Sequence, residues 1–332
     1  MTLNKHDIID QLLSGQNQVP DTSPSTVFAP INIALCKYWG KRDQVLNLPV
    51  TSSLSIALPS LGTRTQVSLI DEDRDSIYLN GKFVERITPF AQKLIAFLDL
   101  FRGEATWHLR IDTYSDVPVA AGLASSASGF AALVLALQAF FDWSLDKKTL
   151  SILARLGSGS ACRSLWPGFV LWQCGERSDG MDSHGIPLTQ TWSDLRIGLL
   201  IFHQQAKPVS SREAMQRTVN SSVLYQSWPL QVKQDLAQIQ TAIAMRDIEQ
   251  LGKAAENNAL AMHATLMASW PPVIYSSSAT LEAMQKIWQL RAEGMQVYFT
   301  QDAGPHLKLL FLEQDTARLK AVFENLQIVE PF

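Results

Sequence analysis

The chain has 332 residues with 46% hydrophobic and 18% charged residues, and its formal net charge is −3. A chain of this length holds roughly two domains of about 150 residues each. The slightly acidic balance argues against a nucleic-acid partner or an anionic membrane surface, although a small anionic ligand needs only a few lysines or arginines.

The cysteine content and the N-terminus bear on location. Cys36, Cys162 and Cys174 are few and show no paired spacing, which favours a reduced protein over a disulfide scaffold or a zinc site. The N-terminus has neither the basic start nor the apolar run of a signal peptide. The most apolar stretch, 129–141, is too short to span a bilayer. We therefore expect a soluble, cytoplasmic protein with no membrane contact.

Strand patterns dominate the first part of the chain. Residues 1–25 are polar and predict a weakly ordered arm with one short helix. Alternating apolar residues then predict strands near 27–35, 54–58, 67–69 and 107–111. Asn80 followed by Gly81 marks a hairpin. Thr88 followed by Pro89 predicts the start of a helix that ends near residue 101.

Helices become more frequent in the later part. A Gly/Ser/Ala-rich loop at 120–128 leads into a helix at 129–141, and Asp146 is placed to cap the next helix. The remaining patterns predict strands at 168–173, 197–202, 295–300 and 307–312, and helices at 228–245, 247–268, 278–293 and 315–325. Because strands and helices come in runs, the fold class is α+β. The polar stretch 185–195 divides the chain into domains 1–190 and 191–332.

The loop at 120–128 is the first feature that suggests chemistry. Small residues before a helix let a polyphosphate approach the backbone N–H groups, where the helix dipole also favours negative charge. Its serines add hydroxyl ligands for phosphate or Mg²⁺. The loop has no GxxxxGK[ST] pattern, and such loops are more often ordinary tight connections.

A cluster of cations and a separate arginine accompany this loop. The strand from residue 29 ends in Lys37, Tyr38, Lys41 and Arg42, a set that suits a polyanionic substrate. Arg163 follows the small-residue turn 157–161, where a guanidinium can grip a carboxylate. A solvated strand end and an arginine that satisfies nearby carbonyls are the structural alternatives.

Two further positions carry weaker signals. Arg212 lies in the first turn of a helix that begins near Ser210, where a cation opposes the helix dipole and hints at a bound anion. Asp302 starts the turn DAGP between the last two strands, a suitable place for a general base. An aspartate in such a turn more often serves the turn itself.

Taken together and in this order, the motifs resemble the mevalonate diphosphate decarboxylases of the GHMP kinase superfamily. The resemblance rests on APINIALCKYWGKRD from Ala29, AAGLASSASGFAAL, GSGSACRSLWPGFVLW, VSSREAM and DAGP, and it covers about residues 27–312. It implies a two-domain fold, with an N-terminal domain like ribosomal protein S5 domain 2, a ferredoxin-like C-terminal domain and the active site in the cleft between them.

The resemblance also implies roles for individual residues. The ATP phosphates would be bound by Gly122, Leu123, Ala124, Ser125, Ser126, Ala127 and Ser128, with Ser126 as a ligand of Mg²⁺. The substrate, mevalonate 5-diphosphate, would be bound by Lys37, Tyr38, Lys41, Ser158, Ser160, Arg163, Ser211 and Arg212. Asp302 would orient or deprotonate the C3 hydroxyl, Lys41 would lie near the reacting end, and Arg163 would hold the C1 carboxylate.

The implied reaction phosphorylates the C3 hydroxyl with ATP and then eliminates phosphate and CO₂ to form isopentenyl diphosphate. We expect a homodimer, although the sequence does not define the oligomeric state. Two positions depart from the family pattern: His306 stands where Asn is common, and Ala214 where Gly is common. A phosphomevalonate decarboxylase, a mevalonate 3-kinase and a non-catalytic binding relative remain alternatives.

Overall fold

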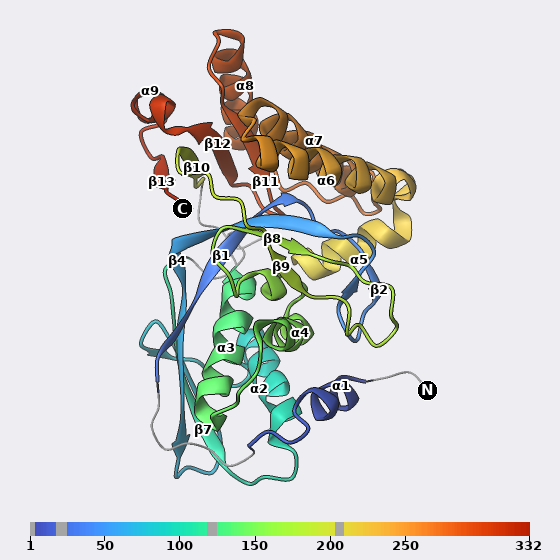
Figure 1. Ribbon diagram of the computed structural model, residues 1–332, viewed down its shortest axis with the longest axis vertical. Coiled ribbons are helices and arrows are strands. Elements are labelled where there is room, and N and C mark those ends of the chain that lie inside the picture. Colours follow the sequence, from blue (N-terminus) through green and yellow to red (C-terminus); the bar gives the residue numbers. More distant parts are fainter. Residues whose placement is uncertain (1–3, 18–24, 118–124, 203–208) are drawn as a thin grey trace.

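The computed structural model describes residues 4–17, 25–117, 125–202 and 209–332, whose strands form two main sheets (Figure 1). The first sheet has the order β6-β5-β7-β4-β8-β9, with β1 paired to β4. Its strands are β1 (Val27–Cys36), β4 (Ser53–Ile70), β5 (Ser76–Leu79), β6 (Lys82–Phe83), β7 (His108–Ser115), β8 (Phe169–Trp172) and β9 (Gly185–Pro187). A small separate hairpin pairs β2 (Lys41–Asp43) with β3 (Leu48–Pro49).

Strand β4 joins two segments that the sequence predicts as separate strands. Its first residues pair with β8, and its last eight pair with β7 from Thr63 to Ile70. Between them, the register against β1 shifts, because Pro30 faces Gly62 while the next residue, Ile31, faces Leu58. This bulge interrupts the apolar alternation, so the sequence shows two short strands where the structure has one of 18 residues.

Three helices pack against the first sheet: α2 (Pro89–Arg102), α3 (Ser125–Phe141) and α4 (Lys147–Gly157). The side chain of Thr88 accepts a hydrogen bond from the N–H of Ala91, and Asp146 accepts one from Thr149, as the sequence predicts. Such caps satisfy N–H groups that the first helical turn leaves unpaired. Helix α3 begins at Ser125, so residues 125–128 of the predicted phosphate loop form its first turn.

The short helix predicted near the N-terminus is α1 (Lys5–Leu12). Ile8, Ile9 and Leu13 are buried in the same core as α2, α3 and α4. The N–H of the Trp143 indole donates to the carbonyl of Asn17 at 2.7 Å. Residues 4–17 are therefore anchored to the first domain, whereas 1–3 and 18–24 lie outside the described residues.

The second sheet has the order β11-β12-β10-β13 and is antiparallel. Its strands are β10 (Leu195–Leu200), β11 (Tyr298–Gln301), β12 (Leu307–Leu312) and β13 (Gln327–Val329). The helices that follow β10 are α5 (Ser211–Ser221), α6 (Trp228–Met245), α7 (Ile248–Met267), α8 (Ser278–Ala292) and α9 (Thr316–Val322). None of the described helices is both long and apolar enough to cross a membrane.

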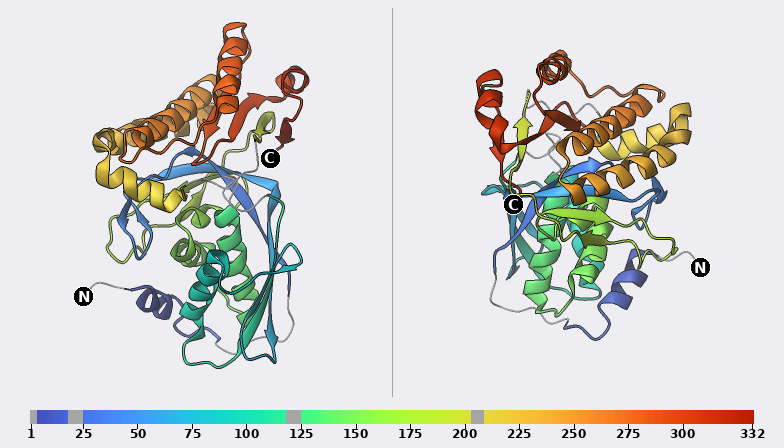
Figure 2. Two further views of the ribbon diagram at one scale, coloured as in Figure 1. Left: turned by 180° about the vertical axis from the view of Figure 1, so that it is seen from behind. Right: turned by 45° about the horizontal axis from the view of Figure 1, so that its top comes forward.

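The two sides of the second sheet belong to different cores, because neighbouring residues of a strand point to opposite faces. Phe299 packs into a cluster with α8 and α9. Tyr298 joins α6, α7 and the β1 residues Ile31 and Ile33 in a cluster that spans both sheets. Figure 2 shows α6 and α7 lying across the end of the first sheet. This shared core positions the ends of β1 and β11 against each other.

Candidate active site

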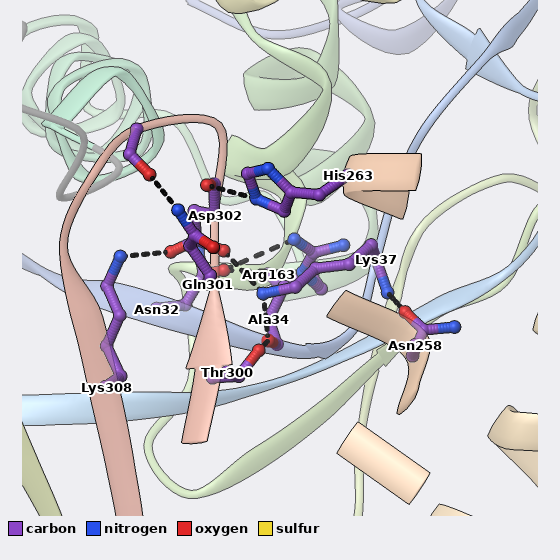
Figure 3. Close-up of polar contacts among 11 residues, drawn as sticks. Asn32, Ala34, Lys37, Arg163, Asn258, His263, Thr300, Gln301, Asp302 and Lys308 are labelled. Carbon is purple, nitrogen blue, oxygen red and sulfur yellow. Dashed lines mark hydrogen bonds and ion pairs between the residues drawn. The ribbon is translucent and has the colours of Figure 1, made fainter. Parts of the chain in front are cut away.

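Asp302, directly after β11, is held between two lysines from different parts of the chain (Figure 3). Lys37 Nζ, beyond the end of β1, lies 2.8 Å from Asp302 Oδ1, and Lys308 Nζ on β12 lies 2.8 Å from Oδ2. Burial alone would raise the pKa of Asp302, but the charges and hydrogen bonds of Lys308 and Lys37 outweigh it and hold the pKa well below its usual range. The carboxylate is therefore ionised at neutral pH.

Burial also acts on Lys37, the residue directly after β1. It lowers the pKa of Lys37 to about 8, and the attraction of Asp302 counteracts only part of this shift. Lys37 Nζ donates a second hydrogen bond to the carbonyl of Ala34 at 2.8 Å, and its backbone N–H donates to Asn258 Oδ1 at 2.7 Å. Asn258 in turn donates to Asp235 of α6. Helices α6 and α7 thus hold the end of β1 in place.

His263 on α7 contacts the backbone of Asp302. Its Nε2 lies 3.1 Å from the backbone carbonyl of Asp302, so Nε2 carries the proton in this contact. Burial, followed by the nearby charge of Lys37, lowers the pKa of His263 to about 4. The imidazole is therefore neutral at pH 7 and acts as a hydrogen-bond donor that positions the turn.

Arg163 lies in the short 3-10 helix η1 (Gly159–Arg163) and is 2% exposed. Its Nε and Nη2 each lie 3.4 Å from Asn32 Oδ1, and Nη1 donates to Ser53. In the described part of the chain, Arg163 makes no ion pair with a carboxylate. A buried cation with only neutral partners is costly, so this guanidinium is suited to an acidic ligand.

The phenol of Tyr38 is packed tightly beside this turn. Its ring centroid lies 4.6 Å from that of Trp172, and a Cβ at Gly159 would lie 2.8 Å from Trp172 and 3.0 Å from Tyr38 Oη. The close approach therefore requires glycine at position 159. The buried hydroxyl of Tyr38 has no hydrogen-bond partner among the described residues. Because buried polar groups are nearly always paired, a ligand is the expected partner.

Lys41 on β2 belongs to a group of cations. Its Nζ donates to Asn47 Oδ1 at 2.6 Å. Burial lowers the pKa of Lys41 to about 8, and the charges of Arg212, Lys93 and Lys5 add to the shift. A group of like charges of this kind favours a ligand with several negative charges.

The predicted residues on α5 lie at its start. Ser210 caps the helix by accepting a hydrogen bond from the N–H of Glu213 at 3.2 Å. Ser211 is the first helical residue, and Arg212 follows with an exposed side chain. Arg212 makes no ion pair with any residue that the structure describes. A cation in this turn opposes the helix dipole, as the sequence indicates.

The predicted phosphate loop is described only in part. Gly122, Leu123 and Ala124 lie outside the described residues, as does the side chain of Ser125. Ser126 is exposed in the first turn of α3, and its Oγ lies 3.3 Å from Oγ of Ser158. The start of α3 therefore meets the turn after α4, which contains the predicted substrate residues Ser158 and the half-buried Ser160.

The hydroxyl of Ser128, predicted to bind the ATP phosphates, lies on the inner face of α3. Its Oγ is buried and lies 2.8 Å from Oγ1 of Thr63 on β4. Ala127 is also buried. Residues 126 and 128 point to different faces because successive residues rotate about 100° around a helix. Among the described side chains of the loop, only that of Ser126 is exposed.

A cavity of about 120 Å³ lies between the first sheet and helices α2 and α3. Its lining is mostly apolar, with a few hydroxyls and one ammonium, and includes Phe90, Lys93, Phe130, Thr63, Thr113 and Ser126. Because Ser126 also marks the start of α3, this cavity opens beside the predicted phosphate loop. Apolar pockets with a few polar groups are typical of ligand sites.

Two family models together match most of the chain. The diphosphomevalonate decarboxylase-like N-terminal domain matches residues 29–185, and the mevalonate 5-diphosphate decarboxylase C-terminal domain matches residues 197–330. The chain belongs to the mevalonate diphosphate decarboxylase family. The resemblance seen in the sequence motifs is thereby confirmed.

Curated relatives support this membership. The diphosphomevalonate decarboxylase of Aspergillus fumigatus is 38% identical over 315 residues, which cover 88% of this chain and 78% of the relative. The enzyme of Saccharomyces cerevisiae is 34% identical over 322 residues, covering 91% and 81%.

Solved structures of mevalonate diphosphate decarboxylases share the fold. The Staphylococcus aureus enzyme matches with a TM-score of 0.86 at 36% identity, covering 93% of this chain and 96% of that one. The Enterococcus faecalis enzyme, in a study of mevalonate-diphosphate-mediated ATP binding, matches at 0.85 and 37%, covering 92% and 96%. A complex named MDDEF with MVAPP, AMPPCP and magnesium matches at 0.86 and 38%, with the same coverage. The predicted α+β fold with two domains is confirmed.

Sequence reasoning gave no role to five residues that the structure places around Asp302, Lys37 and Arg163: Asn32, Ser53, Asn258, His263 and Lys308. Lys308 is 1% exposed within β12, whose other residues are leucine or phenylalanine. Asn32 is likewise buried between isoleucines in β1. A polar residue inside an apolar strand must find a buried partner, and this signal could have identified both positions.

Proposed function

We propose that the chain catalyses the ATP-dependent decarboxylation of (R)-5-diphosphomevalonate to isopentenyl diphosphate, with release of ADP, phosphate and CO₂. The observation that carries this proposal is the pairing of Asp302 with Lys37 and Lys308, close to Arg163, a buried cation that has no carboxylate partner among the described residues. A carboxylate for the hydroxyl and a guanidinium for the acid are the two groups that a 3-hydroxy acid requires. Membership of the decarboxylase family supports the same reaction.

Asp302 acts on the C3 hydroxyl in the first step. Its two lysines keep it ionised, so it accepts a hydrogen bond from the hydroxyl and aims the oxygen at the γ-phosphate of ATP. The low pKa makes it a weak base in the resting site. Phosphoryl transfer passes through a loose transition state and depends mainly on positioning and charge. Orientation is therefore its principal role, and the proton passes to it only as the new O–P bond forms.

Arg163 acts in the second step. The bond between C3 and the phosphate oxygen breaks, and its electrons leave with the phosphate. The bond between C1 and C2 then breaks, CO₂ departs, and that electron pair forms the double bond between C2 and C3. Arg163 holds the C1 carboxylate in line for this loss, and Asn32 and Ser53 hold Arg163. A moderate grip suits a group that the step consumes.

The cation cluster takes the phosphates of the substrate. Tyr38, Ser211 and Arg212 would hold the diphosphate, and Ser158 and Ser160 would lie with Arg163 at the C1 carboxylate. The charge of Arg212 acts on Lys41, so we place Lys41 at the diphosphate and not near the reacting end. The hydroxyl of Tyr38, which no described residue pairs with, supports this assignment, as does the gathering of positive charge around Lys41. A diphosphate matches that charge better than a monophosphate does.

ATP would bind at the start of α3. Backbone N–H groups of residues 122–128 would hold its phosphates, and the cavity beside Ser126 would take the adenine base. In the described part of the chain, no three His, Cys, Asp or Glu residues form a metal cluster. The Ser126 hydroxyl fits Mg²⁺, which keeps several waters and binds chiefly to phosphate oxygens, and which would neutralise the phosphate charge.

A coupled assay of ADP and CO₂ release tests the reaction. It is run with mevalonate, mevalonate 5-phosphate and mevalonate 5-diphosphate as separate substrates. We expect equal amounts of ADP and CO₂, with the highest kcat/KM for the diphosphate. ADP without CO₂ would instead identify a 3-kinase, and preference for the monophosphate would identify a phosphomevalonate decarboxylase.

We further propose a cytoplasmic homodimer. The unpaired cysteines Cys36, Cys162 and Cys174 fit a reducing compartment. Exposed apolar side chains gather where α5 meets the end of α7, and they include Val219, Val223, Met267 and Trp270. A patch of this kind favours a protein interface. Analytical ultracentrifugation should show a dimer for the wild type and a weaker one for Trp270→Ser.

A further inference from the structure

Helix α1 lies outside the residues that the two family models match, but it is part of the folded first domain. The two family models begin at residue 29 and residue 197, so neither includes α1. The helix nevertheless begins with a complete capping box, in which the side chains of Asn4 and Asp7 each accept a hydrogen bond from the backbone N–H of the other residue. Ile8 is 0% exposed and Ile9 is 2% exposed. A segment held so firmly places its remaining side chains at defined positions.

The first residue of α1 points at the end of α4. Lys5 Nζ donates to the carbonyl of Leu156 at 2.8 Å, and the same carbonyl accepts a hydrogen bond from Asn47 Nδ2 at 3.1 Å. Asn47 Oδ1 accepts the hydrogen bond of Lys41 at 2.6 Å. One carbonyl and one amide thus connect the ammonium of Lys5 to that of Lys41. Leu156 also stands two residues before Ser158.

The positive charge of Lys5 is also close to α5. Burial lowers the pKa of Lys5, and the charge of Arg212 lowers it further. The charges of Lys5 and Arg212 both lower the pKa of Lys41. Among the main charges that act on Lys41, only that of Asp43 raises its pKa. Figure 1 and the view from behind in Figure 2 place α1, β2 and α5 along the same side of the molecule. Bringing these cations together costs free energy unless an anion binds between them.

A purely structural role for Lys5 is the alternative. A lysine at the C-terminus of a helix interacts favourably with the helix dipole, and Leu156 is in the last turn of α4. That role explains the hydrogen bond to Leu156. It does not explain why Lys5 shares its surroundings with Lys41 and Arg212, because the structural role would be served better away from other cations.

We propose that Lys5 is a further substrate-binding residue, which adds its positive charge to those of Lys41 and Arg212 where they bind the diphosphate of the substrate. This inference rests on the proposed function and extends the substrate-binding residues to a helix that neither family model covers. The flexible ammonium can leave the carbonyl of Leu156 or share its protons between this carbonyl and a phosphate oxygen. Its effect falls on substrate binding and not on the chemical steps.

The matched variants are Lys5→Gln, which removes the charge but keeps an N–H donor for Leu156, and Lys5→Arg, which keeps the charge. Asn4→Ala is the control for helix α1, because it removes the cap without changing the charge. Lys5→Gln should raise KM for mevalonate 5-diphosphate about 5- to 20-fold at low salt, as expected for one charge-assisted contact. Lys5→Arg should restore KM to within about twofold, and kcat should stay within about twofold throughout.

Ionic strength and the choice of ligand separate the outcomes. The KM difference should shrink in about 0.5 M salt, because salt screens charges that are still in contact with water over a few ångströms. An unchanged KM for the diphosphate would overturn the proposal, as would a rise confined to the KM for ATP. If Lys5→Gln did not fold, Lys5→Met would replace it, and failure of both to fold, as judged by circular dichroism, would make Lys5 a structural residue.

A direct binding measurement distinguishes this proposal from the proposed function. Calorimetric titration of inorganic pyrophosphate should show about 5- to 20-fold weaker binding to Lys5→Gln than to the wild type. If the wild type had no decarboxylase activity but this difference remained, the function would be wrong and the role of Lys5 in diphosphate binding would stand. Equal pyrophosphate affinity in an active enzyme would refute the role of Lys5 alone.

Discussion

The ammonium of Lys308 lies 2.8 Å from Oδ2 of Asp302, and the lysine side chain is 1% exposed. This lysine comes from the strand after the turn that carries Asp302, and Lys37, directly after β1, approaches the other carboxylate oxygen. Both oxygens of the carboxylate are therefore fixed in direction. The pairing makes Asp302 an orienting group with a low pKa, and its protonation state depends on both lysines.

Lys308→Met should shift the acid side of the pH profile. A carboxyl with a lowered pKa stays active until the pH falls through that pKa. Removing one of its cations raises the pKa of Asp302, so activity should be lost at a higher pH than in the wild type. The measurement is kcat/KM against pH, with Lys308→Arg as the control that keeps the charge. If kcat/KM fell at the same acid pH in Lys308→Met and in the wild type, the proposed role of Lys308 would be wrong.

Asp302→Asn should nearly abolish turnover, by about 10²–10⁴-fold, and leave ATP affinity within a few-fold. The amide cannot accept the hydroxyl proton, and it leaves Lys37 and Lys308 without an anionic partner. Turnover and binding of a fluorescent ATP analogue should be measured on the same sample, with the melting temperature as the control for folding. Near-normal turnover would show that Asp302 is not in the reaction.

Arg163→Lys should reduce turnover about 30- to 1000-fold, equivalent to about 2–4 kcal/mol of transition-state stabilisation. A lysine cannot contact Asn32, Ser53 and a carboxylate with the planar geometry of the guanidinium. ADP and CO₂ should be quantified separately. A larger loss of CO₂ than of ADP would place Arg163 in the decarboxylation step, and loss of ATP binding together with the fold would make it structural.

Arg212→Ala should raise KM for the diphosphate about 10- to 100-fold and have a smaller effect on any activity with the monophosphate. The reason is that Arg212 lies at the exposed start of α5 with no ion pair among the described residues. Glu213→Ala is a suitable control, because it changes the charge at the next position. Equal losses on both substrates would place Arg212 away from the distal phosphate.

The alkaline limb of kcat/KM should have a pKa of about 8. Burial lowers the pKa values of Lys37 and Lys41 to about 8, so each loses its positive charge as the pH rises through that value. Anionic substrate then binds less well. Because bound anionic substrate favours the charged form of both lysines, the alkaline limb of kcat should lie at higher pH than that of kcat/KM. Lys41→Arg, whose charge persists at high pH, should leave only the limb from Lys37. A profile flat to pH 10 would contradict both assignments.

Local features of this protein could be predicted from sequence because they depend on residues close together in the chain. Thr88, Asp146 and Ser210 cap helices where their side chains reach the N–H groups three residues ahead. The motifs around Lys37 and Arg163 identified the family because their order and spacing are specific. The bulge in β4 escaped prediction because a shifted register mimics the end of a strand.

The sequence by itself determined the family, the α+β class and the short-range caps, since these follow from motifs and from periodicity within single elements. Only the tertiary structure decided that Lys37 meets Asp302 across 265 positions of sequence, and that Ser128 turns inward to Thr63. It also decided that Lys5 approaches the C-terminal turn of α4. These contacts join elements that are distant in sequence, and they exist because the shared core fixes how strands and helices pack, which no local pattern encodes.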